Sequence, residues 1–105
     1  PVLEDKRAHF LKGLFQDTLP NFLKENKLDK TKRTIVHLDA DLFSSTLYTL
    51  TTLHPYLKKG DILIFDEFNV PNHEFLAFKM YCDSYYIKPQ LIAAANNYFE
   101  VAFLL

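Results

Sequence analysis

Four acidic residues stand in two groups along this sequence, and their types and spacing fit the binding of a divalent metal ion. Asp39 and Asp41 follow one apolar, β-branched stretch, and Asp66 and Glu67 close a second apolar stretch. Asp39 and Asp66 are 66 − 39 = 27 residues apart, close to the ~30 residues of one strand–helix–strand unit. If the two strands are neighbours, about 4.8 Å apart, the carboxylates share the edge where α/β sheets bind ligands.

Carboxylates placed so close together repel one another, and the pKa of at least one of them should rise. A hard divalent cation relieves that repulsion, and ligands that are all oxygen atoms suit Mg²⁺ best. Two less specific interpretations stay open. Asp39 or Asp41 could cap a helix that begins near Ser44, and acids at strand ends are commonly just solvated. The occurrence of four acids at matched strand ends favours the metal site.

Histidines and tyrosines are weaker candidates for a functional role. His37 lies two residues before Asp39, so in a strand the two side chains share a face, although a buried, hydrogen-bonded histidine is the simpler explanation. The other histidines have no metal-ligand spacing. Three tyrosines could line a substrate pocket, although an aromatic helix face more often belongs to the core: Tyr81, Tyr85 and Tyr86.

A strand–helix–strand unit has to position the acids. The sequence predicts strands at 34–40 and 61–68, and leucines at helical spacing predict a helix at 44–57. Such a connection is right-handed and joins parallel strands, so we expect an α/β fold. The remaining predicted elements are a strand at 9–15, a helix at 17–26 capped by Asp17 or Thr18, a cap at Ser44 or Ser45, a helix at 73–86, and one or two tail strands with a turn at 96–97.

Composition excludes several classes of function. Across 105 residues the net charge is −1, which gives no reason to expect nucleic acid or an anionic membrane as a partner. No stretch approaches the ~20 apolar residues of a membrane-spanning helix. The single cysteine, Cys82, cannot form an internal disulfide, which fits the cytoplasm. The two glycines, Gly13 and Gly60, are too few for the loop that holds a nucleotide-like cofactor.

Four stretches of the sequence resemble the macrocin O-methyltransferase family, whose members modify sugar or aromatic hydroxyls of small molecules. They are GLFQDTLP, VHLDADLFSSTLYTL, HPYLKKGDILIFDEF and NNYFEVAFLL, so the resemblance runs from about Lys12 to the end of the sequence. It covers only the later half of the family's domain. It implies the carboxyl-terminal half of a class I methyltransferase sheet, mostly parallel with an antiparallel final strand. Residues 1–105 would then be a single partial domain that lacks the glycine-rich cofactor loop.

The resemblance also assigns roles to the acids. Asp39, Asp66 and Glu67 match the three Mg²⁺-binding positions, although the family usually has aspartate where this sequence has Glu67. Asp41 matches an acid that serves as the general base in some members, while others use an upstream histidine. The implied reaction is methyl transfer from S-adenosylmethionine to a hydroxyl that the metal holds and Asp41 deprotonates. The family's cofactor cradle lies upstream, so this chain alone is expected to be inactive.

A strand order follows from the same resemblance. The segments 9–15, 35–40 and 61–67 match the third, fourth and fifth strands of the family sheet, and the tail forms the sixth and seventh. The implied order in space is fourth, fifth, seventh, sixth. The family's first two strands, which normally lie beside the fourth, have no match in this sequence. We therefore expect an open edge at Thr34 to Leu38 that pairs with another copy or is covered by residues 9–15.

Two other functions stay open on the sequence alone. A haloacid-dehalogenase-like phosphotransferase also places Asp-x-Asp after a strand, with Asp39 as the nucleophile and Asp41 as the acid/base. Against it, bulky Leu42 and Phe43 stand where that family needs a small flexible turn. The chain could instead be a non-catalytic remnant whose sheet edge binds another protein.

Overall fold

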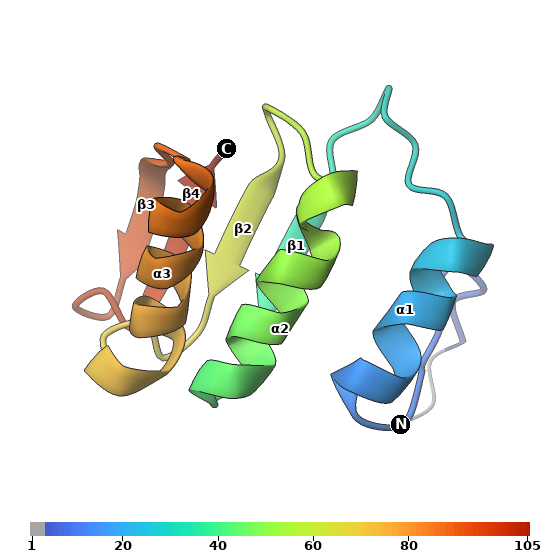
Figure 1. The fold of residues 1–105 in the computed structure, drawn as a ribbon, viewed down its shortest axis with the longest axis horizontal. Helices are drawn as coiled ribbons and strands as arrows, with labels where there is room; N and C mark the ends of the chain where they lie inside the picture. The colour runs from blue at the N-terminus through green and yellow to red at the C-terminus, as the bar shows by residue number, and fades with distance from the viewer. Residues whose placement is uncertain (1–3) are drawn as a thin grey trace.

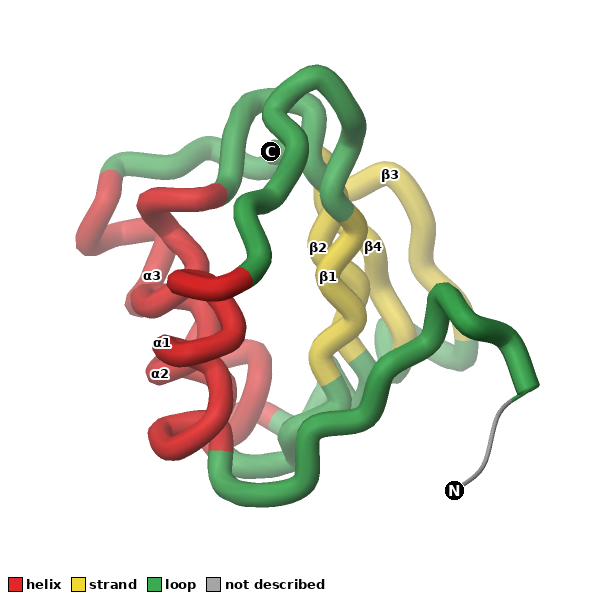
Figure 2. Tube along the Cα trace, turned by 90° about the vertical axis from the view of Figure 1, so that its right-hand side faces the viewer, coloured by secondary structure: helices red, strands yellow, loops and turns green. Residues whose placement is uncertain are grey.

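The computed structural model describes residues 4–105, without the side chain of Pro71, and the chain folds into two layers. A four-stranded sheet forms one layer and three helices lie side by side in the other (Figure 1, Figure 2). No helix in this described part is long and apolar enough to cross a membrane. In chain order the elements are α1 (Phe15–Glu25), β1 (Ile35–Leu38), α2 (Phe43–Leu53), the 3₁₀ helix η1 (His54–Tyr56), β2 (Ile62–Phe65), the π-helical turn η2 (Pro71–Phe75), α3 (Leu76–Tyr85), β3 (Gln90–Ala95) and β4 (Glu100–Leu104).

The strands lie in the order β1-β2-β4-β3. β1 and β2 run parallel, with Leu38 opposite Phe65, whereas β4 runs antiparallel to both of its neighbours. The helix α2 connects β1 to β2 as expected for a strand–helix–strand unit. The α/β class, the strand order and the antiparallel final strand are therefore confirmed.

The core lies between the sheet and the helices α2 and α3. Alternate residues of β2 point into it, so that Leu63 and Phe65 are fully buried, and the ring of Phe65 packs 4.8 Å from that of Phe78 on α3. All of the helices lie on this same side of the sheet (Figure 2). On β1, Ile35 is 59% exposed. Within residues 4–105, the sheet therefore has one face covered by helices and one without a helix.

The segment 9–15 does not form the expected strand. It has no regular structure up to Leu14, and α1 begins at Phe15. Gly13 has a φ of 140°, a conformation open to glycine that interrupts an extended run. Phe15, the last residue of the proposed strand, is instead the first residue of the amphipathic helix α1, which buries Leu23.

The predicted helix caps are also wrong. The N-caps of α1 and α2 are Leu14 and Leu42, and neither helix start has a side-chain capping bond. The helix α1 begins before Asp17 and Thr18, and α2 begins before Ser44 and Ser45 but after Asp39 and Asp41, with Leu42 at its N-cap. The residues that therefore do not serve as caps are Asp17, Thr18, Ser44, Ser45, Asp39 and Asp41.

Candidate functional site

The four predicted acids follow the carboxyl ends of β1 and β2, which lie side by side in the sheet. Leu38 pairs with Phe65, and the N–H of Asp66 donates to the carbonyl of Leu38 at 3.0 Å. Asp39 and Asp66 thus follow two residues that lie directly opposite each other. The expected meeting of the two strand ends is confirmed, and it occurs where ligands bind in α/β sheets. We call Asp39, Asp41, Asp66 and Glu67 the acid edge. It lies at the carboxyl ends of the strands and is distinct from the lateral edge of the sheet along β1.

Asp41 occupies a strained turn directly after β1. Its φ is 62°, in the left-handed region that costs a residue with a Cβ roughly 1–2 kcal/mol. The N–H of Leu42 donates to the carbonyl of Ala40 at 2.7 Å, so the turn closes over three residues, which is a rare and strained form. Glu67, after β2, also has a positive φ, of 50°. Strained residues with side chains persist only where the surrounding structure holds them, and they cluster at functional sites.

Asp41 interacts with two other members of the acid edge. Partial desolvation, followed by the negative charges of Asp41 and Asp66, raises the pKa of Asp39 above its usual range. A side-chain hydrogen bond with Asp41, followed by the charge of Asp41, raises the pKa of Glu67. The expectation that crowded carboxylates gain proton affinity is therefore confirmed for Asp39 and Glu67. Asp41 is therefore the acid that acts on both Asp39 and Glu67.

The carboxylate of Asp66 contacts a histidine. Its Oδ2 lies 3.1 Å from Nε2 of His37. The side chain of His37 is 58% exposed and that of Asp66 is 27% exposed. The sequence favoured a buried, hydrogen-bonded histidine at position 37. The hydrogen bond is confirmed, and the burial is wrong.

The oxygen chemistry of the acid edge suits Mg²⁺, but its side chains do not form a ready metal site. Within residues 4–105, no three His, Cys, Asp or Glu side chains converge closely enough to hold an ion. Asp66 is turned to His37, while Asp39 and Glu67 both interact with Asp41. The backbone brings the three predicted ligands to the same end of the sheet, but their side chains do not converge on a common metal position.

Glu74 is a fifth acid at this edge, and it does not stand among the residues predicted from the sequence. It belongs to η2 and is fully buried. Its Oε2 accepts hydrogen bonds from the N–H of Ala40 at 3.0 Å and the N–H of Asp41 at 3.3 Å. Its Oε1 is buried without a partner. Burial raises the pKa of Glu74 to about 7, with the two backbone hydrogen bonds opposing the rise and the charges of Asp39 and Asp41 adding to it.

A sequence signal for Glu74 does exist. Glu74, Ala77, Phe78 and Tyr81 recur at helical spacing and are all buried. A lone acid on an otherwise apolar helix face has to find partners inside the protein, because an unpaired buried charge is costly. Those partners are backbone groups, which carry no residue-type signature, so the sequence alone does not show what Glu74 contacts.

An aromatic pocket of about 310 Å³ is lined in part by residues that are sequence neighbours of Glu67 and Glu74. It is lined by Phe68, Asn69, Phe75 and Tyr98, of which Phe68 follows Glu67 and Phe75 follows Glu74 in the sequence. Nδ2 of Asn69 donates to the carbonyl of Asn97 at 3.2 Å, which ties the turn before β4 to the loop after β2. Tyr98 is 56% exposed.

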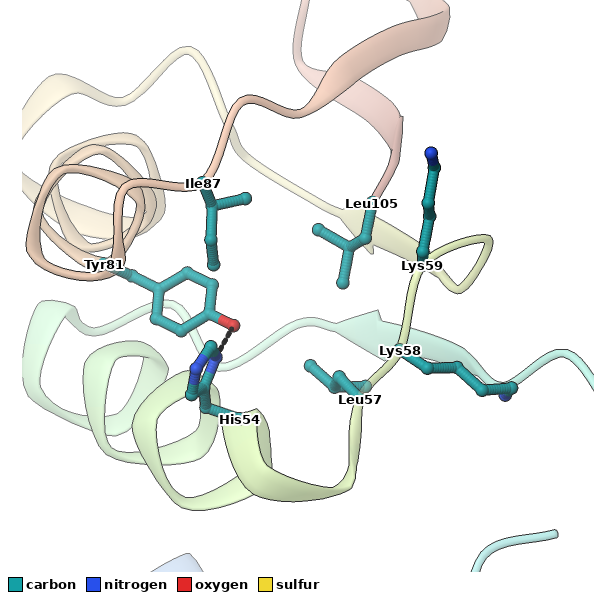
Figure 3. A pocket seen from close by; sticks show the side chains of 7 residues that line it. All are labelled: His54, Leu57, Lys58, Lys59, Tyr81, Ile87 and Leu105. Carbon is teal, nitrogen blue, oxygen red and sulfur yellow. Dashed lines mark hydrogen bonds between the residues drawn. The ribbon is translucent and has the colours of Figure 1, made fainter. Parts of the chain in front are cut away.

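The three tyrosines that could line a substrate pocket or belong to the core lie elsewhere, and Tyr81 belongs to the core. A second pocket, of about 240 Å³, lies beside the amino end of β2 and is drawn in Figure 3, with Tyr81 in its wall. The hydroxyl of Tyr81 is 2.8 Å from Nδ1 of His54, and Tyr85 stacks on the same histidine with ring centroids 3.9 Å apart. Tyr86 is 92% exposed. Tyr81 and Tyr85 therefore pack around His54, at the end of β2 opposite to the acids.

The fold is that of the carboxyl-terminal part of a class I methyltransferase sheet. The structure of the O-methyltransferase NovP matches with a TM-score of 0.74 and 29% identity, covering 97% of this chain and 39% of that one. The apo structure of CalS11, a TDP-rhamnose 3'-O-methyltransferase of calicheamicin biosynthesis, matches with a TM-score of 0.67 and 25% identity, covering 90% of this chain and 39% of that one.

Sequence comparison gives the family. The Macrocin-O-methyltransferase (TylF) family model matches residues 2–99. The demethyldecarbamoylnovobiocin O-methyltransferase of Streptomyces niveus is 36% identical over 66 residues, which are 63% of this chain and 23% of that protein. The mycinamicin III 3''-O-methyltransferase of Micromonospora griseorubida is 30% identical over 69 residues, 66% of this chain and 25% of that protein. The chain belongs to the macrocin O-methyltransferase family, and it spans about a quarter of the length of these relatives.

Proposed function

We propose that this chain is part of an O-methyltransferase that moves a methyl group from S-adenosylmethionine to a hydroxyl of a small molecule. The family and the names of its relatives support the reaction class. The observation that carries the assignment of the site is Asp41, which is held in a strained turn at the ligand-binding edge of the sheet. The alternatives of a phosphotransferase and of a non-catalytic remnant gain no support, since the matching relatives are methyltransferases.

Asp41 is the proposed general base. S-adenosylmethionine, when bound, supplies a methyl group on a positively charged sulfur. As the acceptor oxygen bonds to that methyl carbon, the carbon–sulfur bond breaks and S-adenosylhomocysteine remains. Asp41 takes the hydroxyl proton, because it is an exposed carboxylate at the edge where the acceptor would lie.

Magnesium binding by Asp39, Asp66 and Glu67 is the second part of the proposal. Family resemblance and an all-carboxylate donor set support it, whereas the side-chain geometry does not form a ready site. The proton transfer assigned to Asp41 does not depend on it. Isothermal titration of the chain with MgCl₂, against the Asp39→Asn variant, measures whether these acids bind the ion. Equal heats for the two proteins would remove Asp39 as a ligand.

The acceptor proposed for this site is a sugar or phenolic ring that carries the hydroxyl. The similar protein CalS11 is named for a sugar substrate, TDP-rhamnose. The pocket of Phe68, Asn69, Phe75 and Tyr98, in which Phe68 follows Glu67 in the sequence, offers aromatic surface and an amide, and aromatic faces suit the apolar face of a ring.

The cofactor cradle has to come from sequence other than residues 1–105, because two glycines cannot build it. We therefore expect S-adenosylmethionine to bind the complete protein and not residues 1–105 alone. Calorimetry with S-adenosylmethionine on both proteins, followed by transfer of its labelled methyl group to a panel of glycosides and phenols, tests the proposal. A complete protein that neither binds the cofactor nor labels a hydroxyl would overturn it.

A further inference from the structure

We propose that Glu74 is a positioning residue: it holds the turn Asp39–Asp41 so that the carboxyl group of Asp41 stays between Asp39 and Glu67. The inference rests on the proposed function, in which Asp41 is the base. It goes beyond that function by naming the residue that positions the base. This residue, Glu74, lies in η2 and not in the acid edge.

The contact is made by one carboxylate oxygen and two successive backbone N–H groups. Oε2 of Glu74 accepts from Ala40 at 3.0 Å and from Asp41 at 3.3 Å. Successive N–H groups that converge in this way form a small concave site for an anion. Because both N–H groups of the turn point inward to Glu74, the side chain of Asp41 is left free to point outward, where it is exposed.

The turn needs such a contact because its backbone is strained. Asp41 has a φ of 62°, and the turn is closed by the short bond from Leu42 N–H to the carbonyl of Ala40. A conformation of this kind persists only if neighbouring groups hold it. In the part of the chain that the structure describes, Glu74 is the side chain that hydrogen-bonds to the backbone of residues 40 and 41.

Packing alone does not explain an acid at position 74. Glu74 is fully buried, on the same helical face as the buried residues Ala77, Phe78 and Tyr81, and its Oε1 has no hydrogen-bond partner. Such an unpaired oxygen is costly inside a protein, and an apolar side chain would fill the same space without that cost. What an apolar side chain would lack is the acceptor for the two N–H groups of the turn.

The test compares Glu74→Met, which keeps the volume and removes the acceptor, with Glu74→Gln, which keeps an acceptor oxygen. Phe78→Leu, in the core of the same helical segment, is the control for a general loss of stability. For each variant of the chain, NMR would measure amide exchange at Ala40 and Asp41, and the φ of Asp41 from couplings and chemical shifts.

We expect Glu74→Met to speed exchange of both amides at least tenfold beyond Phe78→Leu at matched global stability, and to release Asp41 from its positive φ. Glu74→Gln should keep both slow amides and the positive φ. Retention of both properties in Glu74→Met would overturn the proposal, as would a Glu74→Gln variant that loses them. These measurements need neither cofactor nor acceptor, so a failure of methyl transfer in the complete protein is a separate result.

Discussion

The side chain of Asp41 combines exposure, backbone strain and contact with two other acids, and this combination makes it the most informative residue to change. In the complete protein, Asp41→Asn should lower kcat by about 10²–10⁴-fold, because an amide cannot accept the hydroxyl proton. KM for S-adenosylmethionine should stay unchanged. The measurement is a steady-state methyl-transfer assay, with Asp83→Asn as the control, since Asp83 is exposed and pairs with Lys79 on α3. Full activity of Asp41→Asn would place the base elsewhere.

Glu74 gives the fold a pH dependence whose sign can be worked out. Its pKa is raised from 4.5 to about 7 in the folded chain, so between these values the folded state binds more protons than the unfolded state. The stability that this group contributes is therefore complete below about pH 4.5 and is lost as the pH rises to about 7. A shift of this size corresponds to a loss on the order of 3 kcal/mol.

The Glu74→Gln variant isolates that contribution, because glutamine does not titrate. We expect urea unfolding to show the wild-type chain losing stability between about pH 5 and pH 8 relative to Glu74→Gln. The difference between the two proteins, rather than either curve alone, removes the effect of the other raised carboxyls, Asp39 and Glu67. Parallel curves for the two proteins across this range would show that Glu74 does not carry the effect.

At the scale of single residues, the sequence predicts where the acids meet and not how they are arranged. Asp39 and Asp66 can be placed together because each follows a strand in a parallel pair, and backbone register fixes such positions. The direction of each side chain is decided by local contacts, such as the bond between Asp66 and His37. Glu74 escapes prediction for a related reason, because its partners are N–H groups of a turn that only the folded chain forms.

Among the secondary-structure elements, the pairing of β1 with β2 depends on a buried acid at the end opposite to the acid edge. Asp61 is fully buried and accepts from the N–H of Thr34, from the N–H of Lys58, and from Nζ of Lys58 at 2.7 Å. Burial by itself would raise the pKa of Asp61, but these hydrogen bonds prevail and lower it. Asp61 thus joins the start of β1 to the start of β2.

Replacing Asp61 by Asn should lower the free energy of unfolding by about 3 kcal/mol near neutral pH, since a buried ion pair loses one partner. Because the folded pKa is lowered, the stabilisation from Asp61 is present above its unfolded value near 3.8 and is lost as the pH falls below it. Urea titrations near pH 7 and pH 3 measure both effects, and the loss should shrink at the lower pH. The exposed pair Lys79–Asp83 is the control, where Asp83→Asn should cost about 1 kcal/mol or less.

The elements themselves are predictable wherever hydrophobic spacing is regular. The parallel strand pair, its connecting helix and the two tail strands match the sequence pattern, and the turn at Asn96 and Asn97 has the positive φ values that asparagine tolerates. The segment 9–15 is wrongly predicted because its alternation is short and Gly13 interrupts it. The helix starts are wrong because the polar residues chosen as caps lie inside α1 and α2.

For the molecule as a whole, we expect the chain to associate with itself. The outer edge of β1 has no strand partner within residues 4–105, and the exposed side chain of Ile35 adds apolar surface to that edge. Unpaired strand edges recruit other strands, and a lysine on the edge opposes this. Sedimentation at micromolar concentration should show dimers or larger species, and Ile35→Lys should shift the chain toward monomer.

Amide exchange across Ile35–Leu38 provides an independent check on the same idea. Association through the edge would protect amides that the isolated sheet leaves exposed, and the protection should fall on dilution. A wild-type monomer in which these amides exchange freely would show that the open edge needs no partner.

The place of β4 in the sheet has a consequence for synthesis on the ribosome. β4 lies between β2 and β3 and hydrogen-bonds to both, although it is made after them. β1, α2 and β2 can therefore assemble as soon as they emerge, whereas β3 has no neighbour to pair with until residues 100–104 leave the exit tunnel. Until then β3, whose six residues stay exposed even in the folded chain, is unpaired, and such intermediates are the ones that aggregate or recruit chaperones. We expect a released chain truncated before Glu100 to be bound by a chaperone that does not bind the chain carrying β4.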